Sequence, residues 1–340
     1  MLESNTHIPE GRVLMSALPV APQVEVLDLR HFSSRQLRPL LEREAEVWRT
    51  RLRWDYRSST ELLLQYLESR ILQGFVAVDR GRVCGYTFCV YEGRKAVIGD
   101  AFAVRPDGRP DASTTRLLLT HAVEMLRNSP AVDRVESQLL LFDADEFRPL
   151  FSGPEFTIYP RLFLGLELPG AARPAVVVPP GLTVMPWTPQ DYQPAAELIH
   201  ACYEGHADAQ INDQYRSLHG SLRFLHNIVR FPGCGVFEAA FSWVLREGHA
   251  RLPLGLILVS RVGDRVGHIT QLCVSPQHRH RGLGRLLLER CATSLLDAGF
   301  EAVTLTVTEG NTDAVRLYER SGFRSMHRFD AMVLNTRFRA

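Results

Sequence analysis

The sequence predicts an α/β protein (α+β, mixed sheet) of two domains, each with a mixed, mostly antiparallel central sheet flanked by helices. The length of 340 residues corresponds to two domains at ~150 residues each. A proline-rich segment, residues 169–181, separates two regions of apolar periodicity, and proline stiffens such a segment and blocks regular pairing. The order of strand-like and helix-like segments is similar on both sides, which indicates two copies of one unit.

The first half is expected to consist of a flexible leader, residues 1–22, and a domain over residues 23–168. Alternating apolar residues predict strands, and apolar residues spaced three and four apart predict helices. The expected strands are residues 24–29, 74–79, 83–91, 96–104, 132–142 and 159–168, and the expected helices are residues 35–50, 60–72 and 113–127.

The second domain is expected over residues 182–340, after the linker at 169–181. Its clearest helix has an apolar stripe that includes Leu287, Cys291 and Leu295, and it stops at Gly299. Valine or leucine alternates with threonine over residues 303–308, which predicts a strand. The expected strands are residues 182–187, 236–246, 254–261, 268–274, 302–308 and 329–334; the expected helices are residues 189–204, 285–298 and 312–320, with a helical excursion over 206–228.

Composition limits the classes of function. The 39 basic and 38 acidic residues leave a net charge of +1, so bulk charge gives no reason to expect nucleic acid or a membrane as partner. No apolar run approaches the ~18 residues of a transmembrane helix, and the N-terminus lacks the pattern of a signal peptide. Six cysteines without a CxxC pair predict free thiols and a cytoplasmic protein.

The most informative segment is QLCVSPQHRHRGLGR, residues 271–285. A strand ends in it, a basic run with Gly282 and Gly284 follows, and a helix begins at once. Free amides at a helix start and the helix dipole favour an anion, glycines allow close approach, and arginines add full charge. Taken alone, this pattern also fits a tight strand–helix turn with a solvated basic face.

A metal site is not expected in this segment. His278 and His280 form an HxH pair, but the segment offers no carboxylate partner, and the neighbouring arginines would repel a cation.

A second segment, EGNTDAVRLYERSGF at residues 309–323, completes a resemblance to the GNAT superfamily of acyl-CoA-dependent N-acetyltransferases. The family's first pattern, after its fourth strand, is matched by Arg279, Gly282 and Gly284. Its second pattern, after the fifth strand, is matched in order by Asn311, Ala314, Leu317, Tyr318, Gly322 and Phe323. The resemblance covers residues 182–334.

The resemblance implies that acetyl-CoA is the co-substrate and lies between the fourth and fifth strands. The backbone of Leu272, Cys273 and Val274 would pair with the pantetheine arm, and Asn311 would bond or orient it. Tyr318 would protonate the departing thiolate, although a tyrosine at this spacing also fits core packing. The segment that would hold the pyrophosphate consists of Arg279, His280, Arg281, Gly282, Leu283, Gly284 and Arg285.

The sequence does not single out one residue as the general base. Many relatives carry a glutamate on the fourth strand, and Gln271 stands there, which cannot accept a proton. His268, Glu309 and a water chain are the alternatives, and His268 also fits a hydrogen-bonded strand histidine. Cys273 is read as a small buried residue and not as an acylated nucleophile, because no activating base is evident and the family transfers acetyl directly.

The first half resembles a GNAT domain that has lost cofactor chemistry. When Val104-Arg105-Pro106 is aligned with Val274-Ser275-Pro276, Arg109 falls on Arg279 but Ala112 and Thr114 replace the two glycines. Farther on, Phe151 falls on Tyr318 and Ala144 on Asn311. A tandem arrangement with one weak half is known, for example in mycothiol synthase, and this architectural resemblance does not name a substrate.

The sequence therefore predicts an acetyl-CoA-dependent N-acetyltransferase that acetylates a primary amine, on a small molecule or a peptide, by direct transfer in a ternary complex. Residues 204–213 are expected to bind the acceptor, with Glu204, Asp208 and Asp213 attracting a cation, unless they form an ordinary polar loop. A non-catalytic acyl-CoA sensor, a partner-binding protein and a longer acyl donor are the alternatives. A monomer or a homodimer is expected, since two halves can form internally the pairing that single-domain relatives make as dimers.

Overall fold

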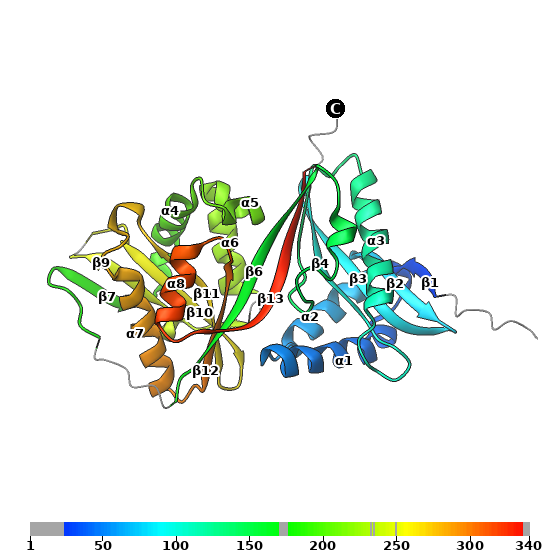
Figure 1. Ribbon diagram of the computed structural model, residues 1–340, viewed down its shortest axis with the longest axis horizontal. Coiled ribbons are helices and arrows are strands. Elements are labelled where there is room, and N and C mark those ends of the chain that lie inside the picture. The colour runs from blue at the N-terminus through cyan, green and yellow to red at the C-terminus, as the bar shows by residue number, and fades with distance from the viewer. Residues whose placement is uncertain (1–23, 170–175, 232, 234, 249, 336–340) are drawn as a thin grey trace, which may run out of the picture.

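A single mixed sheet runs through both halves of the protein and contains 13 strands within the described residues (Figure 1). The computed structural model describes residues 24–169, 176–231, 233, 235–248 and 250–335. The expected leader, residues 1–22, and residues 170–175 of the expected linker lie outside these ranges. The α/β class with a mixed sheet between helices is confirmed.

The elements follow the repeated order that the sequence predicts. The first half contains β1 (Glu25–Asp28), α1 (Ser34–Leu52), α2 (Arg57–Glu68), β2 (Gln73–Asp79), β3 (Arg82–Glu92), β4 (Lys95–Ala103), α3 (Ala112–Asn128), β5 (Arg134–Gln138) and β6 (Phe156–Glu167). The second half contains β7 (Leu182–Pro186), α4 (Tyr192–Tyr203), α5 (Asp208–Ile211), α6 (Leu218–Arg230), β8 (Val236–Phe237), β9 (Trp243–Glu247), β10 (Gly255–Gly263), β11 (Val266–Val274), α7 (Leu283–Asp297), β12 (Ala302–Thr308), α8 (Thr312–Arg320) and β13 (Arg324–Asn335).

The last strand of each half is exchanged. The strand order is β1-β2-β3-β4-β5-β13-β6-β12-β11-β10-β9-β7, with β8 paired to β10. Thus β6 from the first half pairs with β12, and β13 from the second half pairs with β5, both antiparallel. The two exchanged strands also pair with each other and cross the centre of the molecule (Figure 1). Each half therefore depends on the other for a strand of its sheet.

Helices cover the second half on two faces. The side chains of α7 and α8 pack with Ile257, Leu305 and Val307 on one face of the sheet. The side chains of α4 and α6 pack with Leu256, Leu258 and Cys273 on the other face. The core of the first half includes Val266 and Ala302 of the second half, so the two halves are packed together as well as hydrogen-bonded.

Two expected strands are shorter than predicted. Residues 236–246 form β8, a 3₁₀ turn (Ala239–Phe241) and β9, because the Ser242 hydroxyl donates to the Glu238 carbonyl and accepts from the Val259 amide, which stabilises the turn. Residues 132–142 contain only β5, because Leu139, Leu141 and Phe142 leave the strand for the core of the first half.

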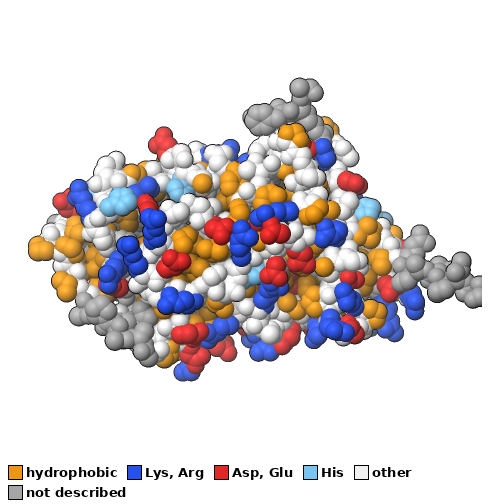
Figure 2. Space-filling view, viewed as in Figure 1, with side chains coloured by type: hydrophobic (Ala, Val, Ile, Leu, Met, Phe, Trp, Pro, Cys, Tyr) orange, Lys and Arg blue, Asp and Glu red, His pale blue; other side chains and the backbone are white. Residues whose placement is uncertain are grey.

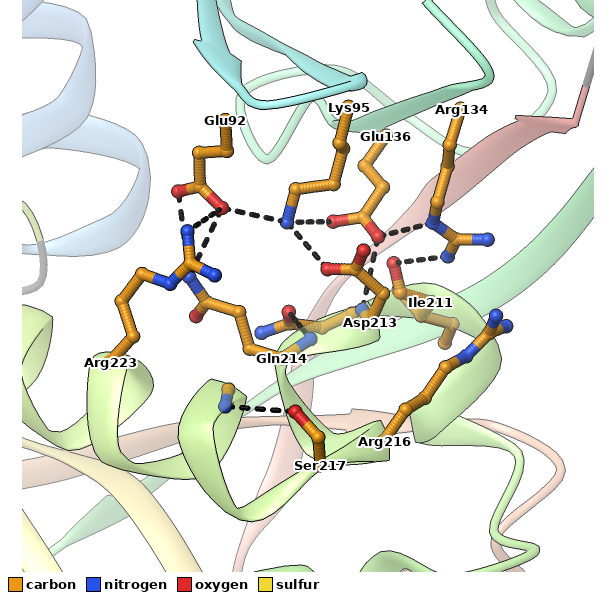
Figure 3. Close-up of polar contacts among 12 residues, drawn as sticks. Glu92, Lys95, Arg134, Glu136, Ile211, Asp213, Gln214, Arg216, Ser217 and Arg223 are labelled. Atoms are coloured by element: carbon orange, nitrogen blue, oxygen red, sulfur yellow. Dashed lines mark hydrogen bonds and ion pairs between the residues drawn. The ribbon is translucent and has the colours of Figure 1, made fainter.

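The only lysine in the sequence, Lys95, lies in a buried network between the two halves (Figure 3). Its ammonium nitrogen is 3.0 Å from Glu92, 3.4 Å from Glu136 and 2.6 Å from Asp213. Glu136 also accepts hydrogen bonds from Arg134 and from the amide of Asp213. The network thus fastens residues that follow α5 to the start of β4 and β5.

We expect Lys95→Met to lower the free energy of unfolding by about 3 kcal/mol, because it leaves buried carboxylates without their cation. Burial alone would lower the pKa of Lys95, but the charges of Glu136 and Asp213 outweigh it and raise that pKa above 10.5. The stabilisation from the charged Lys95 is therefore complete below pH 10.5 and is lost as the pH rises through the folded-state pKa.

Urea unfolding at pH 7 measures the change in the free energy of unfolding, with Lys95→Arg as the charge-conserving control. Equal stability of Lys95→Met and the wild type would contradict it.

Candidate functional site

Two parallel strands of the second half diverge and leave a gap in the sheet. β11 and β12 pair from Val266↔Ala302 to Ile269↔Leu305 and no farther. Beyond that point β11 continues beside β10, and β12 continues beside β6 as far as Thr308↔Arg161. A register shift in the β10–β11 pair lies at the same level and turns β11 away. Leu272, Cys273 and Val274 therefore border the gap with one backbone edge unpaired within the described sheet.

The N-terminus of α7 lies beside this gap and is not capped by a side chain. Gly282 is the N-cap of α7 and has φ of +79°, a left-handed conformation that favours glycine, and it offers no side chain to the first amides of the helix. A Cβ on Gly284 would lie 3.3 Å from the Leu317 side chain, so α7 and α8 approach closely here. These amides and the dipole of α7 are free to bind an anion.

The gap, the start of α7 and one face of α8 enclose a cleft of about 580 Å³. Of the expected cofactor residues, all except Arg281 line it: Leu272, Cys273, Val274, Arg279, His280, Gly282, Leu283, Gly284, Arg285, Asn311 and Tyr318. Figure 2 shows basic side chains gathered over α7 and α8 on this face. Arg279 also has a structural role, because its guanidinium donates to the Cys202 carbonyl at 2.9 Å.

Tyr318 is buried in the cleft wall. Its ring packs against Phe323, with 5.7 Å between centroids, and its hydroxyl makes no hydrogen bond to another described residue. Burial, followed by the charges of Asp208 and Cys273, raises the pKa of Tyr318 above its ordinary range. The phenol therefore stays protonated at neutral pH and can donate a proton into the cleft.

Asn311 has two roles at the start of α8. Its side-chain oxygen accepts from the Ala314 amide and caps the helix. Its side-chain nitrogen lies 3.3 Å from Nε2 of His206, which also lines the cleft. The asparagine of the second motif thus links α8 to the segment after α4.

The other wall of the cleft comes from the end of α4. Tyr203 stacks on Tyr215, with 4.1 Å between ring centroids, and its hydroxyl accepts from the Gln271 amide at 2.9 Å. The Tyr215 hydroxyl donates to the other end of the same amide at 3.3 Å. Gln271 is therefore held at both ends where relatives would carry a glutamate. A hydrogen bond with Cys273, and then the charge of Arg279, lowers the pKa of the Cys202 thiol beside it.

Neither of the two expected bases lies in the cleft. His268 is buried between Trp54 and Phe163, and its Nδ1 is 2.9 Å from the Thr304 hydroxyl. Burial, and then the charge of Arg161, lowers the pKa of His268 to about 3, so its imidazole is a weak base. Glu309 is exposed and pairs with Arg328 at 3.0 Å. His268 lies where β11 is still paired with β12 and is covered by Trp54 and Phe163, whereas Gln271 lies past the bulge beside Tyr203 of α4, which the sequence did not predict.

The three acidic residues expected to attract an acceptor are separated. Asp208 accepts a hydrogen bond from the Thr308 hydroxyl at the edge of the gap. Asp213 is bound to Lys95, and Glu204 is exposed at the end of α4. Only Asp208 therefore lies beside the gap.

Sequence reasoning missed several residues of the cleft. Asp313, Arg316 and Arg320 line it with Leu317, and their helical spacing after Asn311 was a signal for this shared face. Cys202 and Tyr203 had no such signal, because α4 reaches the cleft from the opposite face of the sheet. His206 lies in the segment 204–213 that was expected to bind the acceptor, but it was not singled out there.

The equivalent place in the first half is closed to an anion. The N-cap of α3 is Asp111, and its carboxylate accepts from the Ser113 amide and the Thr114 hydroxyl. A negative charge thus already occupies the helix start. Phe151 replaces the tyrosine and is buried in a 3₁₀ helix (Arg148–Phe151).

The pairing of β4 with β5 ends at Ile98↔Ser137, and beyond it the carboxyl of Asp100 is buried in the first half beside that of Glu44. Glu44 accepts from the Tyr86 hydroxyl at 2.6 Å, and burial raises the pKa of the neighbouring Asp100 to about 6. These polar groups are hydrogen-bonded to one another.

Among the helices in the described ranges, none is both long and apolar enough to span a bilayer. No group of three or more histidine, cysteine or carboxylate side chains in those ranges is arranged to hold a metal ion.

Comparison with known proteins gives three findings. Residues 200–323 match the model of the acetyltransferase (GNAT) family. The mycothiol acetyltransferase of Thermomonospora curvata is 35% identical over 100 residues, which are 24% of this chain and 34% of that protein. The mycothiol acetyltransferase of Thermobispora bispora is 43% identical over 106 residues, 24% of this chain and 36% of that protein. The chain thus spans about a third of the length of these curated relatives.

A solved structure adds evidence on the fold. A tandem GNAT protein from the clavulanic acid biosynthesis pathway superposes with a TM-score of 0.58 at 15% identity, over 92% of this chain and 99% of that one. At this identity the likeness concerns the fold alone.

We expect Gly284→Glu to weaken the binding of acetyl-CoA at least ~10-fold, because a carboxylate at the start of α7 repels a phosphate and fills the space it needs. Isothermal titration with acetyl-CoA measures the change. Gly233→Glu is the matched control, because an added side chain there meets open space. An unchanged affinity of Gly284→Glu for acetyl-CoA would contradict a phosphate-binding site at the start of α7.

Proposed function

We propose, from the match of residues 200–323 to the GNAT family model and the likeness of the fold to a tandem GNAT protein, that the chain is an acetyl-CoA-dependent N-acetyltransferase with its chemistry in the second half. The observation that carries the proposal is the cleft itself. It joins an unpaired strand edge, an uncapped helix start and a buried tyrosine within about 580 Å³, a volume typical of a small-molecule site. The residues present fit acetyl-CoA: Val274 and its neighbours for the pantetheine, and Gly282 to Arg285 for the pyrophosphate.

In this proposal the reaction is direct transfer to a primary amine in a ternary complex. Acetyl-CoA supplies an acetyl thioester. The amine nitrogen forms a bond to the acetyl carbon, and the carbon–sulfur bond breaks. Tyr318 gives its proton to the departing thiolate, a role supported by its burial, by the raised pKa that keeps it protonated at neutral pH, and by a hydroxyl without a hydrogen-bond partner among the described residues.

The amine must lose a proton, and we assign its uptake to His206, directly or through water. This residue lines the cleft, and its Nδ1 lies 3.8 Å from an Asp208 carboxylate oxygen. Imidazole is the side chain that most often accepts a proton in catalysis. Gln271 cannot do so, and His268 and Glu309 lie outside the cleft.

The first half is proposed to be a degenerate GNAT-like domain over residues 23–168 that binds no cofactor of its own. Asp111 at the start of α3 supports this, because its carboxylate occupies the place of a phosphate. We further propose a monomer that works in the cytoplasm on a small-molecule or peptide amine, without nucleic acid or membrane. The exchanged strands support the monomer, and the lack of a disulfide among the cysteines that the structure describes supports the compartment.

We expect Tyr318→Phe to lower kcat by ~100-fold or more, because the thiolate then departs without a proton donor. The dissociation constant of acetyl-CoA should change less than ~3-fold, since the ring still packs in the cleft wall. Release of CoA thiol with a panel of amines measures turnover. The exposed Tyr66→Phe is the matched control. Unchanged kcat in Tyr318→Phe would remove this residue from the mechanism.

A further inference from the structure

Arg161 of the first half reaches the gap between β11 and β12. It lies on β6 directly opposite Thr308, so the two side chains share one face of the sheet. Its Nη2 atom is 3.5 Å from the Thr306 hydroxyl. Both threonines follow Leu305, the last residue of β12 that pairs with β11. The guanidinium therefore borders the gap on the face opposite α7 and α8, whose side chains pack with Leu305 and Val307.

This cation has no carboxylate partner among the described residues. Its Nη1 atom donates to the side chain of Gln138, its guanidinium lies 6.0 Å from the centre of the Phe329 ring, and its buried Nε atom has no hydrogen-bond partner. Neighbouring acids are bound elsewhere: Glu136 by Lys95 and Arg134, and Glu309 by Arg328. A half-buried cation with only neutral partners is costly unless an anion joins it.

An acid without a full cationic partner lies on the other side of Thr308. Asp208 accepts from the Thr308 hydroxyl, its side chain is 15% exposed, and the nearest basic group in the described chain is His206 at 3.8 Å. The charge of Asp208 also contributes to the raised pKa of the Tyr318 phenol. The gap is thus bordered by one unmatched positive group and one unmatched negative group.

We propose that the acceptor is an amine that also carries an acidic group, a carboxylate or a phosphate. Arg161 and Gln138 bind the acidic group, and Asp208 holds the ammonium before its proton is removed. The planar guanidinium has paired donors that match the oxygens of either acid. The inference rests on the proposed acetyl transfer and adds the class of acceptor. It also gives the first half a part in the site, since both Arg161 and Gln138 belong to it.

The test compares matched pairs of amines with the full-length protein and acetyl-CoA, with CoA release as the readout. One arm uses an amino acid and its amide, for example L-alanine and L-alaninamide, or L-phenylalanine and L-phenylalaninamide. The other arm uses glucosamine 6-phosphate and glucosamine. The two arms distinguish a carboxylate from a phosphate. Arg161→Gln removes the charge, Arg161→Lys restores it, and Arg82→Gln is a matched change at an exposed arginine of β3.

In at least one arm we expect the wild type to prefer the acidic amine by ~10- to 100-fold in kcat/KM, the usual size of a charge-assisted hydrogen bond. Arg161→Gln should lose this preference through the KM of the acidic amine. The KM of acetyl-CoA should stay unchanged, and Arg161→Lys should recover part of the preference. Arg82→Gln should behave as the wild type does.

Equal use of acidic and neutral amines by the wild type would overturn the inference and leave the proposed acetyl transfer intact. The same conclusion follows if Arg161→Gln keeps the preference. Absence of CoA release with every amine would instead overturn the proposed function, and the inference with it. The wild-type comparison decides the matter even if Arg161→Gln does not fold.

Discussion

Main-chain pairing between the halves is the constraint on which the rest of the structure depends. β6 hydrogen-bonds to β12 over Thr308↔Arg161 to Ala302↔Glu167, and β13 hydrogen-bonds to β5 in the same way. Because β12 is fixed on this side, it can diverge from β11 on the other side and leave the gap open. The cleft of the second half is thus bordered by a strand of the first half, and the buried Lys95 network fastens the segment after α5 to the same sheet.

The two halves show how one scaffold can keep or lose an anion site through few residues. At the start of α7, Gly282 leaves the first amides open, whereas Asp111 supplies its own carboxylate at the start of α3. The phenol of Tyr318 has Phe151 as its counterpart in the first half. What the first half retains is the strand exchange, the network around Lys95 and the guanidinium of Arg161. In the proposed function, the first half binds no cofactor and borders the acceptor side of the other half.

Sequence reasoning predicted the element order and brought together most of the residues that line the cleft along β11, α7 and α8, because local motifs encode both. Gly282, Gly284 and Asn311 lie next to the helices they start, so their spacing alone places them. The exchange of β6 and β13 could not be predicted, because the sequence of an antiparallel strand does not show which strand it pairs with. His268 was misjudged because it lies where β11 is still paired with β12, and Trp54 and Phe163 of the first half cover it there, which are contacts that no local motif encodes. Asp208 was expected to attract the acceptor and His206 lies in the same segment, but their positions beside the gap depend on tertiary packing that the sequence does not show.

The most direct test of the account is the stoichiometry of acetyl-CoA binding, measured by calorimetric titration of the purified chain. The open start of α7 and the capped start of α3 predict one site per chain. Two equivalent sites would contradict the assignment of the first half as a domain without cofactor chemistry. No binding at all would contradict the acetyl transfer proposed for the second half.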